Sequence, residues 1–261
     1  MQNESNLNFY VSSLSELDDT IDVFRKKYPK SKMIFRGQSV ADWKLESTLE
    51  RFCSKNKLDF IEYCRNIFSI AGYIQSAKGL SFDLIDLKNI VQNKESDNYN
   101  NINYLPSYPY WVFLRQYGYP SPLLDWSLSP HIATFFSLWQ SKCDSALWIY
   151  IEKPEGFKIH GTDMTNIEIK GPFTPNEKRH YLQQAVYTIA WKWEIKNGRR
   201  IFMPYETIRK DIKQDLFIKI VLNKSMHDDC INYFDQSNLN IYSLMQDTDS
   251  LMKYLTYKYF F

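Results

Sequence analysis

Arg36 is the first residue whose surroundings suggest chemistry. It follows the apolar run Met33–Phe35 and precedes Gly37. An arginine that loses water needs a carboxylate, a phosphate or several carbonyl oxygens to accept its hydrogen bonds. Gly37 has no side chain, so backbone or ligand can approach closely there. The two residues together indicate an anion site, whose other groups must come from elsewhere in the chain.

Other reactive residues form none of the common catalytic or metal-binding patterns. The four cysteines lack metal-site spacing, and His131 and His180 have no histidine partner at helical or strand spacing. Each histidine is an acid–base candidate, although a lone histidine is more often structural. The chain has no Gly-x-Ser-x-Gly elbow, and its 8 glycines form no phosphate-binding loop. We therefore expect no metal site and neither of those catalytic classes.

The composition is that of a globular chain rich in aromatic residues. Of its 261 residues, 44% are hydrophobic and 24% are charged, and the formal net charge is +2. Basic residues are spread along the chain, which does not favour general nucleic-acid binding. The run at 196–200 is expected to be a solvated loop. Aromatic residues make up 16%, and we interpret them, with Trp43 and Trp126, as core residues rather than base-stacking platforms.

The spacing of the cysteines and the length of the apolar runs indicate the cellular compartment of the protein. The cysteines form no close pair, the start of the chain does not resemble a signal peptide, and no apolar run approaches membrane-spanning length. These features predict a cytoplasmic protein with free thiols and no membrane partner.

Periodicity predicts the elements that must position Arg36. Residues 12–28 predict a helix in which Ser13 and Glu16 form a capping box, and residues 32–37 predict a short buried strand. Further helices are predicted over 46–52 and 58–77. Residues 92–104 are polar and aperiodic, which predicts a flexible insertion.

The second half of the chain alternates irregularly between helices and strands. Within 109–139, Gly118 closes one helix, and Ser129 caps another that has Pro130 at its first position. Strands are predicted over 146–152, 182–190 and 216–222, followed by short helices. Helices around strands without regular βαβ alternation indicate an α+β fold, which we assign to a single domain over 1–261.

Three motifs resemble those of the FRG domain family, which is named for its Phe-Arg-Gly opening. "FRGQ" at 35–38 is followed by "YGYPSPLLDWSLSPHIATFF" at 117–136 and by Arg179–Thr188. The resemblance covers about residues 14–258. The chain departs from the family pattern at Arg115 and Gln116 (usually Gln and His), at Pro122 (usually Arg) and at Ala185 (usually Gly). The family has no settled activity, and some members look like parts of bacterial defence or toxin systems.

A second resemblance, to ADP-ribosyltransferases, implies a chemistry. "IFRG", "LLDWSLSPHIATFF" and "LQQAVYT" are similar to the three strand motifs of that fold in order and approximate spacing. The resemblance implies an ADP-ribosyltransferase-like core of short strands, flanked by N- and C-terminal helices. It also implies that Arg36 holds the pyrophosphate of NAD, that Ser127 lies at the nicotinamide pocket, and that Gln183 occupies the position of the catalytic glutamate.

These motifs give the candidate site residues. Arg36, Asp125 and Gln183 are the catalytic candidates. NAD-binding candidates are Arg36, Gly37, Gln38, Trp126 and Ser127. Because Gln183 supplies no negative charge to an oxocarbenium-like transition state, a catalytic site needs another carboxylate, with Asp125 as the first choice and Glu177 as the second. Strand alternation would place Gln183 toward the cleft with Ala185 and Tyr187.

Each candidate also has a structural alternative. In the simplest structural alternative, Arg36 forms an ion pair with Asp125. This pair would hold the strand predicted at 32–37 against the FRG-like motif at 117–136. Asp125 would otherwise cap a turn, and Gln183 would satisfy carbonyls at a strand edge.

The leading functional hypothesis is an NAD-directed ADP-ribosyltransferase or NAD-consuming effector of a bacterial defence or toxin system, acting on a protein or nucleic-acid acceptor. The alternative is a non-enzymatic module that binds a nucleotide-like ligand or a protein. A nucleic-acid-processing factor is a third hypothesis, which rests on aromatic content alone.

Overall fold

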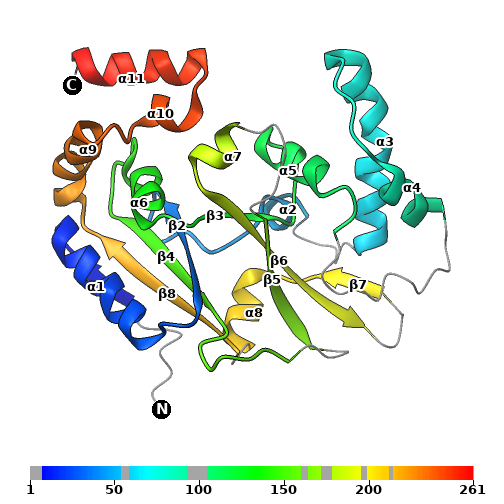
Figure 1. The fold of residues 1–261 in the computed structure, drawn as a ribbon, viewed down its shortest axis with the longest axis horizontal. Coiled ribbons are helices and arrows are strands. Elements are labelled where there is room, and N and C mark those ends of the chain that lie inside the picture. The colour runs from blue at the N-terminus through cyan, green and yellow to red at the C-terminus, as the bar shows by residue number, and fades with distance from the viewer. Residues whose placement is uncertain are drawn as a thin grey trace.

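One mixed sheet organises the protein. The computed structural model describes residues 8–53, 59–92, 105–159, 164–171, 178–194, 199–211 and 214–260. Within these residues an 8-stranded sheet has the order β1-β8-β4-β2-β3-β6-β5, and β7 also pairs with β6 (Figure 1). The strands are β1 (Asn8–Val11), β2 (Lys32–Gln38), β3 (Leu124–Ser127), β4 (Ser145–Glu152), β5 (Thr165–Lys170), β6 (Ala185–Glu194), β7 (Arg199–Phe202) and β8 (Asp215–Leu222). β1 and β8 are parallel, and the other pairs are antiparallel.

Helices from the N-terminal, central and C-terminal parts of the chain pack around the sheet (Figure 1). They are α1 (Leu14–Lys27), α2 (Thr48–Phe52), α3 (Phe60–Lys78), α4 (Ile85–Gln92), α5 (Tyr108–Gln116), α6 (Pro130–Leu138), α7 (Lys178–Leu182), α8 (Tyr205–Asp211), α9 (His227–Gln236), α10 (Ile241–Met245) and α11 (Thr248–Phe260). In Figure 1, α1, α6 and α9 lie beside β2, β4 and β8, whereas α3, α4 and α5 lie toward β6 and β7. This arrangement confirms the α+β class.

Alternation along the strands divides the core between the two faces of the sheet. In β4, Leu147 and Ile149 pack in the core cluster that contains residues of α1, α6 and α9. Trp148 and Tyr150 pack on the opposite face, in the cluster that contains Tyr205 of α8. Both faces of β4 are therefore covered, which explains why its apolar residues are almost continuous in sequence.

The sheet opens between β2 and β3, next to Arg36. β2 and β4 pair along the seven residues Lys32–Gln38, but Phe35 and Ser127 form the one registered pair between β2 and β3. β3 continues instead along β6, where Asp125 lies opposite Tyr187. Arg36 follows Phe35 directly, so its side chain lies where two neighbouring strands diverge.

Several sequence predictions are confirmed. α1 falls within 12–28, and the Ser13 side chain accepts a hydrogen bond from the Glu16 N–H. The Glu16 carboxylate returns to the N–H of Ser12 rather than of Ser13, so the box is displaced by one residue. β4 and β8 each begin one residue before their predicted starts. Ser129 caps α6 with Pro130 in its first turn.

The predicted strand at 182–190 begins too early. α7 continues to Leu182, and Gln184 adopts a left-handed conformation with a φ of 48° before β6 starts at Ala185. Strand alternation therefore does not apply to Gln183, which lies in the turn. The sequence reading also missed β1, β5 and β7, which are short or bounded by charged residues that obscure the alternation.

Two environments were predicted wrongly. Trp43 is 52% exposed and is no core residue, whereas Trp126 is 3% exposed, as predicted. Of the predicted solvated loop at 196–200, residues 196–198 lie outside the described residues, and Arg199 has a 62% exposed side chain but begins β7 together with Arg200. Arg200 is buried, with its guanidinium 4.7 Å from the ring centroid of Phe60 and 4.8 Å from that of Trp191, a geometry that aromatic faces stabilise.

The remaining predictions concern the insertion at 92–104, membrane-spanning helices and metal sites. The proposed insertion at 92–104 lies outside the described residues except for Gln92, which ends α4. Among the helices of the described ranges, none has the length and apolar character needed to cross a membrane. The same ranges contain no group of three or more His, Cys, Asp or Glu side chains placed to hold a metal ion.

Candidate functional site

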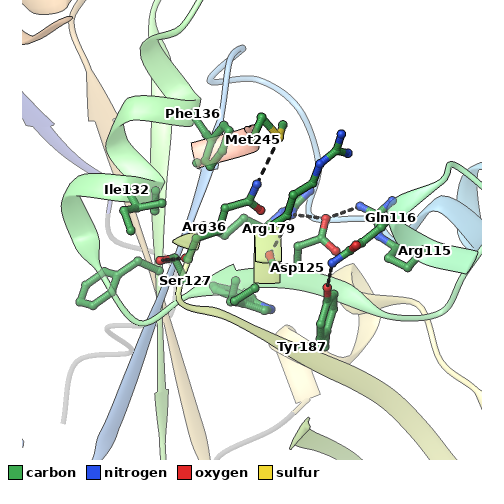
Figure 2. A pocket seen from close by; sticks show the side chains of 16 residues that line it. Arg36, Arg115, Gln116, Asp125, Ser127, Ile132, Phe136, Arg179, Tyr187 and Met245 are labelled. Carbon is green, nitrogen blue, oxygen red and sulfur yellow. Dashed lines mark hydrogen bonds and ion pairs between the residues drawn. The ribbon is translucent and has the colours of Figure 1, made fainter. Parts of the chain in front are cut away.

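A pocket of about 310 Å³ lies where the sheet opens. Its walls come from β2, β3 and β6 and from α5, α6, α7 and α10 (Figure 2). Three guanidinium groups line it, together with one carboxylate and two amides: Arg36, Arg115, Arg179, Asp125, Gln116 and Gln183. The pocket thus collects positive charge that the sequence distributes over distant segments.

Arg36 is held by the strand across the opening. Its Nη1 donates to the backbone oxygen of Asp125 at 2.9 Å and lies 3.7 Å from the Asp125 carboxylate oxygen Oδ2. Its Nε is buried and has no hydrogen-bond partner. Burial lowers the pKa of Arg36 to about 10, against an opposing contribution from Asp125 and with a smaller lowering by Arg115. The guanidinium therefore stays charged at neutral pH, with its lost hydration only partly replaced.

Asp125 bridges two arginines. Its Oδ2 accepts a hydrogen bond from Arg115 Nη2 at 2.5 Å while lying near Arg36, and its side chain remains 42% exposed. The structural pairing between Arg36 and Asp125 considered from the sequence is therefore present. This pairing leaves some donor groups of the arginines without partners, because Nε of Arg115, like Nε of Arg36, is buried and has no hydrogen-bond partner.

Arg115 and Gln116 come from the last turn of α5, at the positions where the sequence departs from the FRG pattern. Gln116 Nε2 lies 3.4 Å from the hydroxyl oxygen of Tyr187, and its Oε1 is buried without a partner. Arg115 thus supplies a guanidinium to the same pocket, although Pro122 replaces the usual arginine of the second motif.

Arg179 lies on α7 and pairs with Asp247, which precedes α11. One carboxylate, from Asp125, lines the pocket beside the three guanidiniums. If Asp247 is also counted, the three guanidiniums and two carboxylates still carry a net positive charge. An anionic ligand is the partner that this imbalance favours.

Gln183 reaches the pocket from the turn after α7. Its Nε2 donates to the backbone oxygen of Leu244 at 3.2 Å and lies 3.2 Å from the sulfur of Met245. Ser127 donates its hydroxyl to the Gln183 backbone oxygen at 2.8 Å and accepts from the Ser129 N–H at 3.0 Å. Ser127 and Gln183 therefore line the pocket while also fastening its walls to one another.

Three of the NAD-binding candidates have clear structural roles. A Cβ on Gly37 would lie 2.0 Å from the backbone oxygen of Ala133, so the missing side chain admits α6. Gln38 accepts from Trp148 Nε1 at 2.8 Å and donates to the Lys44 oxygen at 3.0 Å, and it does not line the pocket. Trp126 contributes to the wall, and its Nε1 donates to the Thr188 hydroxyl at 2.8 Å.

The remaining candidates lie elsewhere. Glu177 is outside the described residues. His131 lies 3.0 Å from the Asp18 carboxylate. His180 is buried, with its ring stacked on Tyr187 at a centroid distance of 5.6 Å. Neither histidine lines the pocket.

Sequence reasoning missed part of the site. Arg115 and Gln116 were visible as departures from the FRG pattern, but nothing in the sequence marked them as ligands. The pocket residues that were not predicted to lie there include Arg115, Gln116, Phe136, Arg179 and Met245, whereas Ala185 and Tyr187 line the pocket as strand alternation predicted. Met245 belongs to a short helix whose position depends on tertiary contacts, so no local signal could have identified it.

Comparison with known families supports the first resemblance. Residues 31–145 match the family model of the FRG domain. The match includes Arg36, Arg115 and Asp125 and supports the FRG family for this part of the chain, but it excludes Arg179, Gln183 and Met245. Searches of curated proteins and of solved structures found no match. The resemblance to ADP-ribosyltransferases gains no support from these comparisons.

The lowered pKa of Arg36 predicts how anion binding depends on pH. If the charged guanidinium binds an anion, affinity is expected to be full at neutral pH and to fall as pH rises through about 10. The buried charge costs stability below that pH, and a bound anion offsets the cost by raising the pKa. Sulfate, compared with sodium chloride at equal ionic strength, should therefore raise the melting temperature more at neutral pH than above pH 10. A sulfate effect of equal size at the two pH values would contradict the assignment to Arg36.

Proposed function

We propose that the pocket binds the phosphates of a nucleotide, that NAD is this nucleotide, and that the protein is an NAD-directed ADP-ribosyltransferase or another NAD-consuming enzyme. The observation that carries the binding proposal is the pair of arginines, Arg36 and Arg115, whose Nε atoms are both buried without partners. Planar guanidiniums suit the paired oxygens of phosphates and pyrophosphates. The pocket has the charge and the donors for such a group.

In the proposed reaction the bond between nicotinamide and ribose breaks, nicotinamide leaves with the bonding electron pair, and the same ribose carbon forms a bond to an acceptor nucleophile or to water. Positive charge develops on the ribose in the transition state, and a nearby carboxylate stabilises it. Asp125 is the one carboxylate that lines the pocket among the described residues, and it is partly exposed to the cavity. Gln183 would contribute a hydrogen bond to a ribose hydroxyl, but no charge.

A binding module without catalysis is the second candidate function. It is favoured by the position of Asp125, because two guanidiniums lie against its carboxylate and partly neutralise the charge that catalysis would need. The same arginines would still bind phosphate. Release of nicotinamide separates the two candidates.

Three proteins at matched folded concentration test the reaction: wild type, Asp125→Asn and Gln183→Glu. For an enzyme, we expect slow NAD consumption by wild type, none by Asp125→Asn, and faster consumption by Gln183→Glu. The glutamate adds the missing negative charge, although it also loses the bond to Leu244, so folded fractions must be compared first by circular dichroism. A binding module would bind NAD without turnover in all three. Absence of both turnover and NAD binding in wild type would refute the proposed function.

The wider role stays a prediction. A bacterial defence or toxin effector would transfer ADP-ribose to a protein or nucleic acid, or would deplete NAD. Incubation with labelled NAD and cell extract tests this, because transfer leaves label on a macromolecule whereas depletion leaves it on small products.

A further inference from the structure

The two sides of the pocket differ in chemistry. Arg36, Arg115 and Asp125 form a polar side that comes from β2, β3 and α5. Ile132 and Phe136 of α6 and Met245 of α10 form an apolar side. Figure 2 shows Phe136 and Met245 close together, away from Arg115 and Gln116. A ligand that fills the pocket would therefore place a charged group and an apolar group at opposite ends.

Met245 is held in this position by contacts with α7 and with the turn that follows it. Gln183 Nε2 donates to the Leu244 oxygen and contacts the Met245 sulfur, both at 3.2 Å. Gln246, with a φ of 54°, ends α10, and Asp247 then pairs with Arg179. Asp247 also accepts from the Ser250 N–H at 2.7 Å, which caps the start of α11. The C-terminal helices thus present Met245 to the pocket as part of a hydrogen-bonded assembly.

The size of the pocket limits what it can enclose. Its volume of about 310 Å³ lies near the lower end of the range for small-molecule sites, roughly 300–1,000 Å³. This space suits one ring with an adjoining phosphorylated sugar better than both nucleosides of a dinucleotide. The polarizable thioether of Met245 and the ring of Phe136 favour a flat aromatic group.

We infer that Met245 and Phe136 are specificity-determining residues that select a phosphorylated ligand carrying one flat ring, such as a nucleoside monophosphate or one half of a dinucleotide. This inference rests on the proposed function, since it requires phosphate at the arginines. It assigns ring selection jointly to α6 and to the C-terminal α10, and α10 lies outside the segment 31–145 that matches the FRG domain.

Calorimetric titration tests this inference with ligands that share a phosphate and differ in the ring. The ligands are ribose 5-phosphate, nicotinamide mononucleotide and AMP, each titrated into wild type, Met245→Ala, Phe136→Ala and the control Met252→Ala. Met252 is 50% exposed on α11 and does not line this pocket. Wild type and the control should bind at least one ring-bearing ligand about tenfold more tightly than ribose 5-phosphate. Met245→Ala and Phe136→Ala should lose most of that preference while binding ribose 5-phosphate equally well.

The outcomes separate the two proposals. Binding of ribose 5-phosphate without any gain from a ring, or a ring preference that survives both alanine variants, would overturn the inference and leave the proposed function standing. Failure of all three ligands to bind wild type would overturn the inference, and failure of NAD to bind as well would overturn the proposed function.

A measurement on the Met245 side chain of the wild-type protein tests the same inference without requiring the alanine variants to fold. The methyl resonance of Met245, labelled with ¹³C and assigned with Met245→Leu, should shift through the ring current when the ring-bearing ligand binds. Ribose 5-phosphate should leave it nearly unchanged. Equal shifts with both ligands would overturn the inference.

Discussion

Arg36→Lys is expected to weaken phosphate binding by roughly ten- to a hundredfold, since hydrogen bonds to charged groups contribute about 1.5–3 kcal/mol. A lysine supplies a point charge and cannot reproduce the planar donors that contact Asp125 and would also reach a ligand. The melting temperature should also fall, because the buried ammonium would lose hydration without recovering the same bonds. Titration with pyrophosphate beside a melting curve measures both effects.

Arg25→Lys provides the matched control. Arg25 pairs with Asp22 on α1, and both side chains are more than half exposed. Exposed ion pairs contribute little to stability, so this variant should keep the wild-type melting temperature and affinity. If Arg36→Lys lowered stability but left affinity unchanged, Arg36 would be a structural residue only. If it changed neither, both of its assigned roles would be wrong.

Gly37→Ala should strongly destabilise the protein. The added Cβ would lie 2.0 Å from the Ala133 oxygen and 2.7 Å from the Ser137 nitrogen, both of which belong to the backbone of α6. The helix must shift as a unit, at a cost of about 3 kcal/mol or more. For a chain of this size the melting temperature should fall by roughly 6–12 °C, because each 1 kcal/mol shifts it by about 2–4 °C.

Gly72→Ala is the control for this substitution. Gly72 lies within α3, and a Cβ there would meet nothing within 4 Å. The alanine should stabilise the helix by about 0.5–1 kcal/mol through its higher helix propensity. Equal stability of Gly37→Ala and wild type would show that α6 does not pack as closely on β2 as the structure indicates.

Local signals predicted the elements beside Arg36 well. The Ser129 cap with Pro130 defined the start of α6, and the apolar run before Arg36 defined β2. Both depend on interactions between residues close in sequence, so one segment is enough to identify them. Asp125 and Gln183 became candidates through the resemblance to ADP-ribosyltransferases rather than through local signals, and both line the pocket.

Contacts between distant segments limited the rest of the prediction. Gln184 shows no strong sequence signal for its left-handed conformation, so the start of β6 was misplaced. Trp43 was assigned to the core on residue type alone, although an aromatic residue is not obliged to be buried. Arg179 and Met245 join the pocket because α7 packs near α10, a relation that the spacing of residues does not encode.

The most direct test of the account is an NMR spectrum of the arginine Nε–H groups during titration with pyrophosphate. The Nε atoms of Arg36 and Arg115 are both buried without a hydrogen-bond partner, and the proposed function requires these guanidiniums to bind a phosphate. Their two Nε–H signals, assigned with Arg36→Lys and Arg115→Lys, should shift together and saturate, while the signal of exposed Arg25 stays in place. Signals of Arg36 and Arg115 that remain unchanged with pyrophosphate in large excess would contradict the claim that this pocket binds phosphates.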